Sequence, residues 1–140
     1  MADLSSPPTA PQLRNKSCRV LVVEDNLDSA KALAITLTRD DHEVETTRNG
    51  TEALVVAAQF QPHIVLIDIG LPGVDGLYVA RQLRRAHREL LIIAATGRSS
   101  PEDRRLSREA GCDYHLVKPL DFQVVTRILN DWKGNGGCDN

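Results

Sequence analysis

The chain alternates short aliphatic runs with stretches of helical periodicity five times, and this alternation limits its fold more than any other feature. The aliphatic runs predict strands at residues 19–24, 42–46, 63–68, 90–96 and 113–117. The periodic stretches predict helices at about 27–39, 50–60, 75–87, 101–110 and 121–132. Strands that alternate with helices build a parallel sheet with helices on both faces, so we expect a doubly wound α/β fold.

The polarity of the runs predicts where each strand lies in the sheet. Residues 19–24, 63–68 and 90–96 are almost continuously apolar, as expected of central strands that are covered on both faces. The run 42–46, HEVET, is more polar and fits an edge strand. Ligands of open parallel sheets bind beyond the carboxyl ends of the strands, so the functional site is expected at that edge.

The folded part is predicted to span residues 18–133 as one domain of the 140-residue chain. Residues 1–17 are rich in Pro, Ser, Thr and Ala, which is typical of a disordered leader or linker. Residues 134–140 are rich in Gly and Asn and are expected to form a flexible tail.

Composition narrows the class of protein further. A net charge of −2 gives no positive field for direct nucleic-acid binding. The sequence has neither an apolar run of about 18 residues nor a signal-peptide core, so we expect a cytoplasmic chain without membrane insertion. Cys18, Cys112 and Cys138 are odd in number and widely spaced, which favours free thiols in a reducing compartment.

Polar side chains end four of the five predicted strands. Glu24 and Asp25 end the first strand, Asp68 the third, Thr96 the fourth and Lys118 the fifth. Because the carboxyl ends of parallel strands meet at one edge of a sheet, three acids, one hydroxyl and one ammonium group converge there. An ion-pair cluster of purely structural purpose is the alternative, but burying charge for structure alone is costly.

The residue types in this group suit phosphoryl transfer. Three neighbouring carboxylates repel one another and need a counter-charge, which Mg²⁺ (or Mn²⁺) supplies with oxygen ligands. Lys118 adds a second positive charge, and Thr96 can donate a hydrogen bond to a phosphoryl oxygen. Asp68, between a metal and a lysine, is a plausible covalent phosphoryl acceptor. Gly70, Gly73 and Gly76, with Pro72, are expected to form a tight turn that keeps a Cβ away from the metal.

Over residues 18–133 the chain resembles the receiver domains of two-component response regulators. The motifs that carry the resemblance are VVEDN, LIDIGLPGVDG, AATG and LVKP, in this order. The resemblance implies a flavodoxin-like (βα)5 sheet of five parallel strands in the order 2-1-3-4-5. It also implies a signalling domain, one that can dephosphorylate itself, and not an enzyme acting on external substrates.

The resemblance also implies roles for particular residues. Glu24 and Asp25 match the acidic pair that holds Mg²⁺ together with Asp68 and the backbone carbonyl of Gly70. Asp68 matches the phospho-acceptor. Lys118 matches the family's lysine, and its peptide bond to the following proline is typically cis in that family.

A partner and a switch are implied as well. A histidine kinase or a histidine phosphotransfer protein would donate the phosphoryl group, and the downstream protein target is not implied by any motif. Thr96 matches the switch hydroxyl, and an aromatic side chain three positions before the lysine would swing inward, changing the face formed by the fourth helix, fifth strand and fifth helix. That position holds His115, where the family more often has Tyr or Phe, and Tyr114 should point to the opposite side of the strand.

Two other functions compete with this one. A phosphorylation-independent, receiver-like interaction module is disfavoured because all the site residues are present. A phosphatase or phosphotransferase of the haloacid dehalogenase type needs a second Asp two residues after the nucleophile, where this chain has Gly70. The chain is expected to be either a stand-alone receiver or a piece of a larger protein such as a hybrid histidine kinase.

Two further groups of residues are expected to carry no function. Surface or edge positions without metal-type spacing are predicted for His42, His63 and His87. A solvated helix face is predicted for Arg81, Arg84, Arg85 and Arg88.

Overall fold

The computed structural model describes residues 17–70 and 75–138, which form a three-layer α/β domain. Five strands alternate with five helices along the chain. The strands are β1 (Arg19–Val23), β2 (Glu43–Thr47), β3 (Ile64–Asp68), β4 (Leu91–Thr96) and β5 (Tyr114–Val117). The helices are α2 (Leu27–Arg39), α3 (Gly50–Phe60), α4 (Gly76–Ala86), α5 (Pro101–Glu109) and α6 (Phe122–Gly134). Each element lies within about two residues of its predicted bounds.

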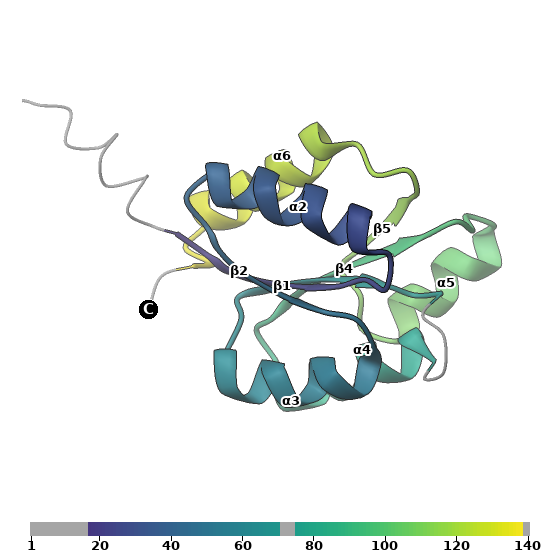
Figure 1. Ribbon diagram of the computed structural model, residues 1–140. Coiled ribbons are helices and arrows are strands. Elements are labelled where there is room, and N and C mark those ends of the chain that lie inside the picture. The colour runs from purple at the N-terminus through teal and green to yellow at the C-terminus, as the bar shows by residue number, and fades with distance from the viewer. Residues whose placement is uncertain (1–16, 71–74, 139–140) are drawn as a thin grey trace, which may run out of the picture.

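All neighbouring strands pair in parallel, in the order β2-β1-β3-β4-β5. This confirms the predicted doubly wound sheet and its strand order. Helices α2 and α6 cover one face, and α3 and α4 cover the other, with α5 beside them (Figure 1). The three central strands are almost entirely buried, whereas β2 at the edge is mostly exposed, as its polarity predicted.

Each of the five helices begins directly after a residue whose side chain caps it. Side chains of Asn26, Asn49, Asp75, Ser100 and Asp121 each accept a backbone N–H of the first helical turn. The start of α5 is a capping box with proline at its first position, so the expected start at Pro101 is confirmed. These caps fix where each helix leaves the carboxyl edge of the sheet, which is where the polar residues gather.

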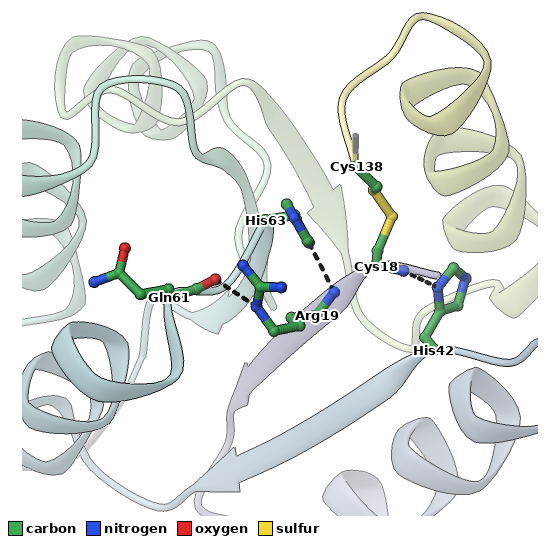
Figure 2. The surroundings of a disulfide bond; sticks show 6 residues. All are labelled: Cys18, Arg19, His42, Gln61, His63 and Cys138. Carbon is green, nitrogen blue, oxygen red and sulfur yellow. Dashed lines mark hydrogen bonds between the residues drawn. A yellow bond between two sulfur atoms is a disulfide. The ribbon is translucent and has the colours of Figure 1, made fainter. Parts of the chain in front are cut away.

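The expectation of three free thiols is wrong, because Cys18 and Cys138 form a disulfide (Figure 2). Their Cα atoms lie 5.2 Å apart although 120 positions separate them in sequence. The start of β1 and the turn after α6 meet in one apolar cluster, and sequence spacing could not reveal this pairing. Cys112 is the free cysteine among the described residues, and its thiol is buried.

Residues 134–138, which were predicted to begin a flexible tail, pack against the domain instead. Helix α6 continues to Gly134, and the turn after it packs on Trp132 so closely that a Cβ at Gly137 would overlap the indole ring. Cys138 is buried at the end of this turn. Residues 1–16 of the leader predicted over 1–17, and residues 139–140 of the predicted tail, lie outside the described residues.

Two residues expected at the surface have structural roles instead. His42 is buried, and its Nδ1 accepts the backbone N–H of Cys18 at 3.1 Å (Figure 2). Arg84 is half-buried and donates to the carbonyl oxygens of Gly111, Arg88 and Leu90. Its guanidinium also pairs with Asp113 Oδ2 at 2.7 Å, so it joins α4 to the segments before β4 and β5.

Candidate functional site

Asp68 lies at the centre of the carboxyl edge, where its two oxygens have different partners. It is the last residue of β3, paired with Ala95 of β4, and it is buried. Oδ2 accepts a hydrogen bond from Lys118 Nζ at 2.9 Å, and Oδ1 accepts the backbone N–H of Gly70 at 2.9 Å. A carboxylate at the end of a rigid central strand is therefore held in one orientation at the floor of the edge.

The acidic pair after β1 stands next to Asp68. Glu24 is buried and accepts Lys118 Nζ at 2.8 Å on Oε1 and the N–H of Asn26 at 3.0 Å on Oε2. Asp25 is exposed to solvent. One carboxylate oxygen from each of Glu24, Asp25 and Asp68 lies within 4.8 Å of the others, which is close enough to share a metal ion.

Lys118 is the cation that these carboxylates share. Burial works to lower the pKa of Lys118, but the hydrogen bonds to Glu24 and Asp68 and their negative charges outweigh it, so its pKa is raised. The ammonium is therefore charged at neutral pH. The Lys118–Pro119 peptide bond is cis, as the resemblance implied.

Thr96 ends β4, which lies between β3, whose last residue is Asp68, and β5, which Lys118 follows. It is buried, and its Oγ1 accepts the backbone N–H of Arg98 at 3.1 Å. Its carbonyl oxygen accepts the N–H of Lys118 at 2.8 Å, which fixes the end of β5 beside β4. The hydroxyl thus stands at the same edge as the carboxylates, with its position set by the loop after β4.

The glycines of the loop after β3 are needed to different degrees. A Cβ at Gly70 would lie 3.5 Å from Asp68 Oδ1, which is ordinary contact, so the backbone itself does not require glycine there. A Cβ at Gly76 would lie 2.6 Å from the carbonyl oxygen of Ile69, so the close approach of α4 to the end of β3 does require it. Pro72 and Gly73 lie outside the described residues.

His115 occupies the middle of β5 opposite Ala94 and points toward α5. Its two ring nitrogens lie 2.9 Å from Ser107 Oγ and 2.9 Å from the carbonyl oxygen of Arg98. Sequence reasoning missed Ser107 and Arg98, because a serine within a polar helix and a backbone carbonyl of a loop leave no pattern in the sequence.

The structure therefore brings together the side chains of Glu24, Asp25, Asp68 and Lys118 and places the backbone of Gly70 against Asp68. Thr96 ends β4 at the same edge of the sheet. Comparison with protein families matches residues 20–130 to the response regulator receiver domain. The chain belongs to this family. It is a receiver domain of two-component systems.

Relatives of known sequence agree with this membership. The transcriptional regulatory protein PrrA of Mycobacterium leprae is 39% identical over 113 residues, which cover 80% of this chain and 48% of PrrA. AfsQ1 of Streptomyces coelicolor, also a transcriptional regulatory protein, is 35% identical over 76% of this chain and 47% of its own length. The receiver chain thus spans about half the length of the curated relatives it matches.

Solved receiver structures share the fold. The chemotaxis protein CheY4 of Vibrio cholerae gives a TM-score of 0.78 at 26% identity, over 82% of this chain and 98% of that one. The receiver domain of Ssk1 from Saccharomyces cerevisiae, crystallised with the histidine phosphotransfer signalling protein Ypd1, gives 0.78 at 25% identity, over 83% and 88%. No helix in the described part of this receiver is both long and apolar enough to cross a membrane.

Proposed function

We propose that this receiver accepts a phosphoryl group on Asp68 and thereby switches its contacts with a downstream protein. The observation that carries the proposal is the placement of Asp68, a buried carboxylate with an ammonium at 2.9 Å and two further acids beside it. Buried, oppositely charged side chains that meet at the carboxyl edge of a parallel sheet are more typical of a functional site than of a purely structural ion pair.

Glu24, Asp25, Asp68 and the Gly70 carbonyl are the groups that would hold Mg²⁺, or Mn²⁺. Three carboxylates against the single ammonium of Lys118 leave two negative charges, which one divalent cation neutralises. The oxygen-only donor set fits a hard cation of this kind. Such a cation, when bound, neutralises the phosphoryl oxygens during transfer.

In the transfer step an oxygen of Asp68 forms a bond to phosphorus while the bond from phosphorus to the donor's imidazole nitrogen breaks. The imidazole leaves with the electron pair of that bond, and Asp68 becomes an acyl phosphate. Lys118, already 2.9 Å from Asp68, offers its ammonium to the new phosphoryl oxygens. The Thr96 hydroxyl now accepts a hydrogen bond from the Arg98 N–H. It can rotate away from this donor and donate its own hydrogen to another phosphoryl oxygen.

The donor in this proposal is a histidine kinase or a histidine phosphotransfer protein. The likeness to the Ssk1 receiver, which was crystallised with a phosphotransfer protein, supports that kind of partner. The proposal places the domain in the cytoplasm, with no direct contact to nucleic acid and with protein partners only. An output activity like those of the transcriptional relatives would need a further domain, either in the same protein or in a partner.

The alternative function is a receiver-like module that binds partners without phosphorylation. The complete set of site residues and their convergence disfavour it. Both alternatives predict the same fold, so only a measurement of phosphoryl uptake separates them.

The experiment that tests the proposal is the intact mass of the chain after incubation with acetyl phosphate, with and without Mg²⁺. We expect the mass of one phosphoryl group to be added only with Mg²⁺, and not in Asp68→Asn. Asp131→Asn, which changes an exposed acid of α6, is the matched control and should take up the group normally. Full uptake by Asp68→Asn would show that another residue is the acceptor, and no uptake by the unaltered chain would favour the interaction module.

A further inference from the structure

Cys18, one of the two cysteines of the disulfide, is firmly attached to the sheet (Figure 2). Its N–H donates to His42 Nδ1 at 3.1 Å, and its carbonyl oxygen accepts the N–H of Glu43 at 3.0 Å. It directly precedes β1 and is fully buried. These bonds hold Cys18 whether or not its sulfur is joined to Cys138.

Cys138, its partner, ends the turn of residues 135–138, which has few contacts of its own with the rest of the domain. The backbone N–H groups of this turn donate to carbonyl oxygens of Asp131, Trp132 and Lys133, all in the last turn of α6. No hydrogen bond in the described part of the chain joins the turn to a strand or to another helix. Residues 135–137 are Asn, Gly and Gly, so Cys138 supplies the one apolar side chain of the turn. The disulfide is therefore the main link between this turn and the sheet.

The closed turn also leaves a polar group of Trp132 unsatisfied. The indole N–H is buried and finds no acceptor among the described residues. Gly137 covers the indole so closely that a Cβ there would overlap it. A buried donor without a partner is destabilising, and water would satisfy this one if the turn moved away. The turn is also one wall of a cavity of about 390 Å³ beside Arg84, Arg88 and Asp113, so it is not closely packed on that side.

We propose that the Cys18–Cys138 disulfide is a reversible redox latch, which a dithiol reductant opens so that residues 135–138 leave the domain and uncover the indole of Trp132. The core stays folded, because the other buried members of the same apolar cluster belong to strands and helices and not to the turn. Disulfides are rare in the cytoplasm, and those that form there are usually catalytic or redox-sensing. Phosphoryl transfer is not required for this latch, and of the proposed function only the cytoplasmic placement enters.

Opening of the latch is a thiol–disulfide exchange. One thiolate of the dithiol attacks Sγ of Cys138, which is 6% exposed whereas Cys18 is fully buried. The disulfide bond breaks, and Cys18 leaves as a thiolate that takes up a proton. The second thiol of the reductant then displaces Cys138 from the mixed disulfide, and the reductant itself ends as a disulfide. Two electrons and two protons thus pass from the dithiol to the two cysteines.

The test compares the unaltered chain before and after treatment with dithiothreitol, without denaturant. Trp132 is the single tryptophan of the chain, so its fluorescence reports on the turn directly. We expect its emission to shift to longer wavelength, its quenching by acrylamide to rise several-fold, and Cys138 to be alkylated rapidly while Cys112 stays protected. A bond that resists dithiothreitol until the chain unfolds, or whose reduction leaves Trp132 and Cys138 covered, overturns the proposal. Alkylation of Cys112 as well would mean that reduction unfolds the whole domain, which also contradicts a latch.

Two glycines near the end of α6 give a matched pair of variants. A Cβ at Gly137 would overlap Trp132 and oppose closure of the turn, whereas nothing lies within 4 Å of a Cβ built at Gly134. In a titration with mixtures of reduced and oxidised dithiothreitol, we expect Gly137→Ala to open at a several-fold lower ratio of dithiol to disulfide than the unaltered chain. Gly134→Ala should open as the unaltered chain does. Equal midpoints for the two variants would show that bond formation and closure of the turn are not coupled, and would overturn the latch. These measurements need no phosphoryl group, so their outcome is independent of uptake by Asp68.

Discussion

Lys118 Nζ donates to Asp68 Oδ2 across 2.9 Å, although the two residues are 50 positions apart and strand β4 lies between β3, which Asp68 ends, and β5, which Lys118 follows. The same ammonium donates to Glu24 Oε1 at 2.8 Å. We predict that Lys118→Ala lowers the free energy of unfolding by about 1–3 kcal/mol without Mg²⁺, because two buried carboxylates lose their charged donor. Urea unfolding with and without Mg²⁺ measures this effect.

Addition of Mg²⁺ should stabilise Lys118→Ala more than it stabilises the unaltered chain, because the cation then meets three uncompensated carboxylates instead of two. Lys31→Ala, which removes an exposed ammonium from α2, is the matched control and should respond to Mg²⁺ normally. If Mg²⁺ stabilised Lys118→Ala and the unaltered chain equally, Lys118 and the metal ion would not be offsetting the charge of the same carboxylates.

Gly76 and Gly97 offer a comparison of two glycines at the same edge of the sheet. A Cβ at Gly76 would lie 2.6 Å from the carbonyl oxygen and 2.7 Å from the Cα of Ile69, and backbone atoms cannot move aside cheaply. We predict that Gly76→Ala destabilises the fold by about 1–3 kcal/mol and slows phosphoryl uptake, because the loop that carries Gly70 must shift.

Gly97→Ala is the control, since nothing lies within 4 Å of a Cβ built there. It should leave the free energy of unfolding within about 0.5 kcal/mol of the unaltered value. A Gly76→Ala variant as stable as Gly97→Ala would show that α4 can approach β3 without a glycine.

The sheet, and the meeting of polar side chains at its carboxyl edge, could be predicted from the sequence because both depend on local patterns. Aliphatic runs such as 64–67 identify buried strands. In a parallel sheet the carboxyl ends of the strands lie at one edge, so polar residues at these ends must lie near one another. Asp68 and Lys118 could be paired in this way before any distance was known. The capping residue Asp121 likewise fixes a helix start through its immediate neighbours.

The remaining features depend on contacts between distant segments, which no local pattern reports. The pairing of Cys18 with Cys138 needs the start of β1 and the turn after α6 to meet. Burial of His42 depends on the same meeting, and the Ser107–His115 bond depends on how α5 lies against β5. A polar residue in such a contact looks like a surface residue in the sequence.

The Cys18–Cys138 disulfide closes almost the whole domain into one loop. In the chain-entropy account a loop of more than 100 residues stabilises the folded state by about 4–5 kcal/mol, and 120 positions separate these cysteines. We predict that a thiol reductant lowers the urea midpoint of the unaltered chain and has little effect on Cys18→Ser. An equal response of the two chains would mean that the bond does not form in solution.

Thiol counts in the same samples identify the bond directly. Burial, together with the charge of Asp113, raises the pKa of the Cys112 thiol to about 12 despite the opposing charge of Arg84, so this thiol stays protonated and unreactive in the folded chain. We expect no alkylated cysteine in the folded, non-reduced chain, Cys112 alone after unfolding, and all three after unfolding with reductant. Alkylation of Cys18 in the non-reduced chain would contradict the disulfide.

His42 makes the stability of the domain depend on pH. Burial, and then the positive charge of Lys133, lowers the pKa of His42 below its ordinary value of 6.5, against the smaller opposing effects of Asp40 and Asp41. Protonation would also place a hydrogen on Nδ1, which now accepts the N–H of Cys18. The folded chain therefore binds fewer protons at His42 than the unfolded chain does.

It follows that the contribution of His42 is fully present above pH 6.5, decreases as the pH falls below 6.5, and levels off below its folded pKa. His42→Asn keeps a side-chain acceptor for Cys18 but cannot titrate, so its loss of stability between pH 7.5 and 5 should be smaller than that of the unaltered chain. Urea unfolding of both chains over this range, in the oxidised state, measures the difference. Parallel pH profiles for the two chains would show that His42 is as easily protonated in the folded domain as in the unfolded one.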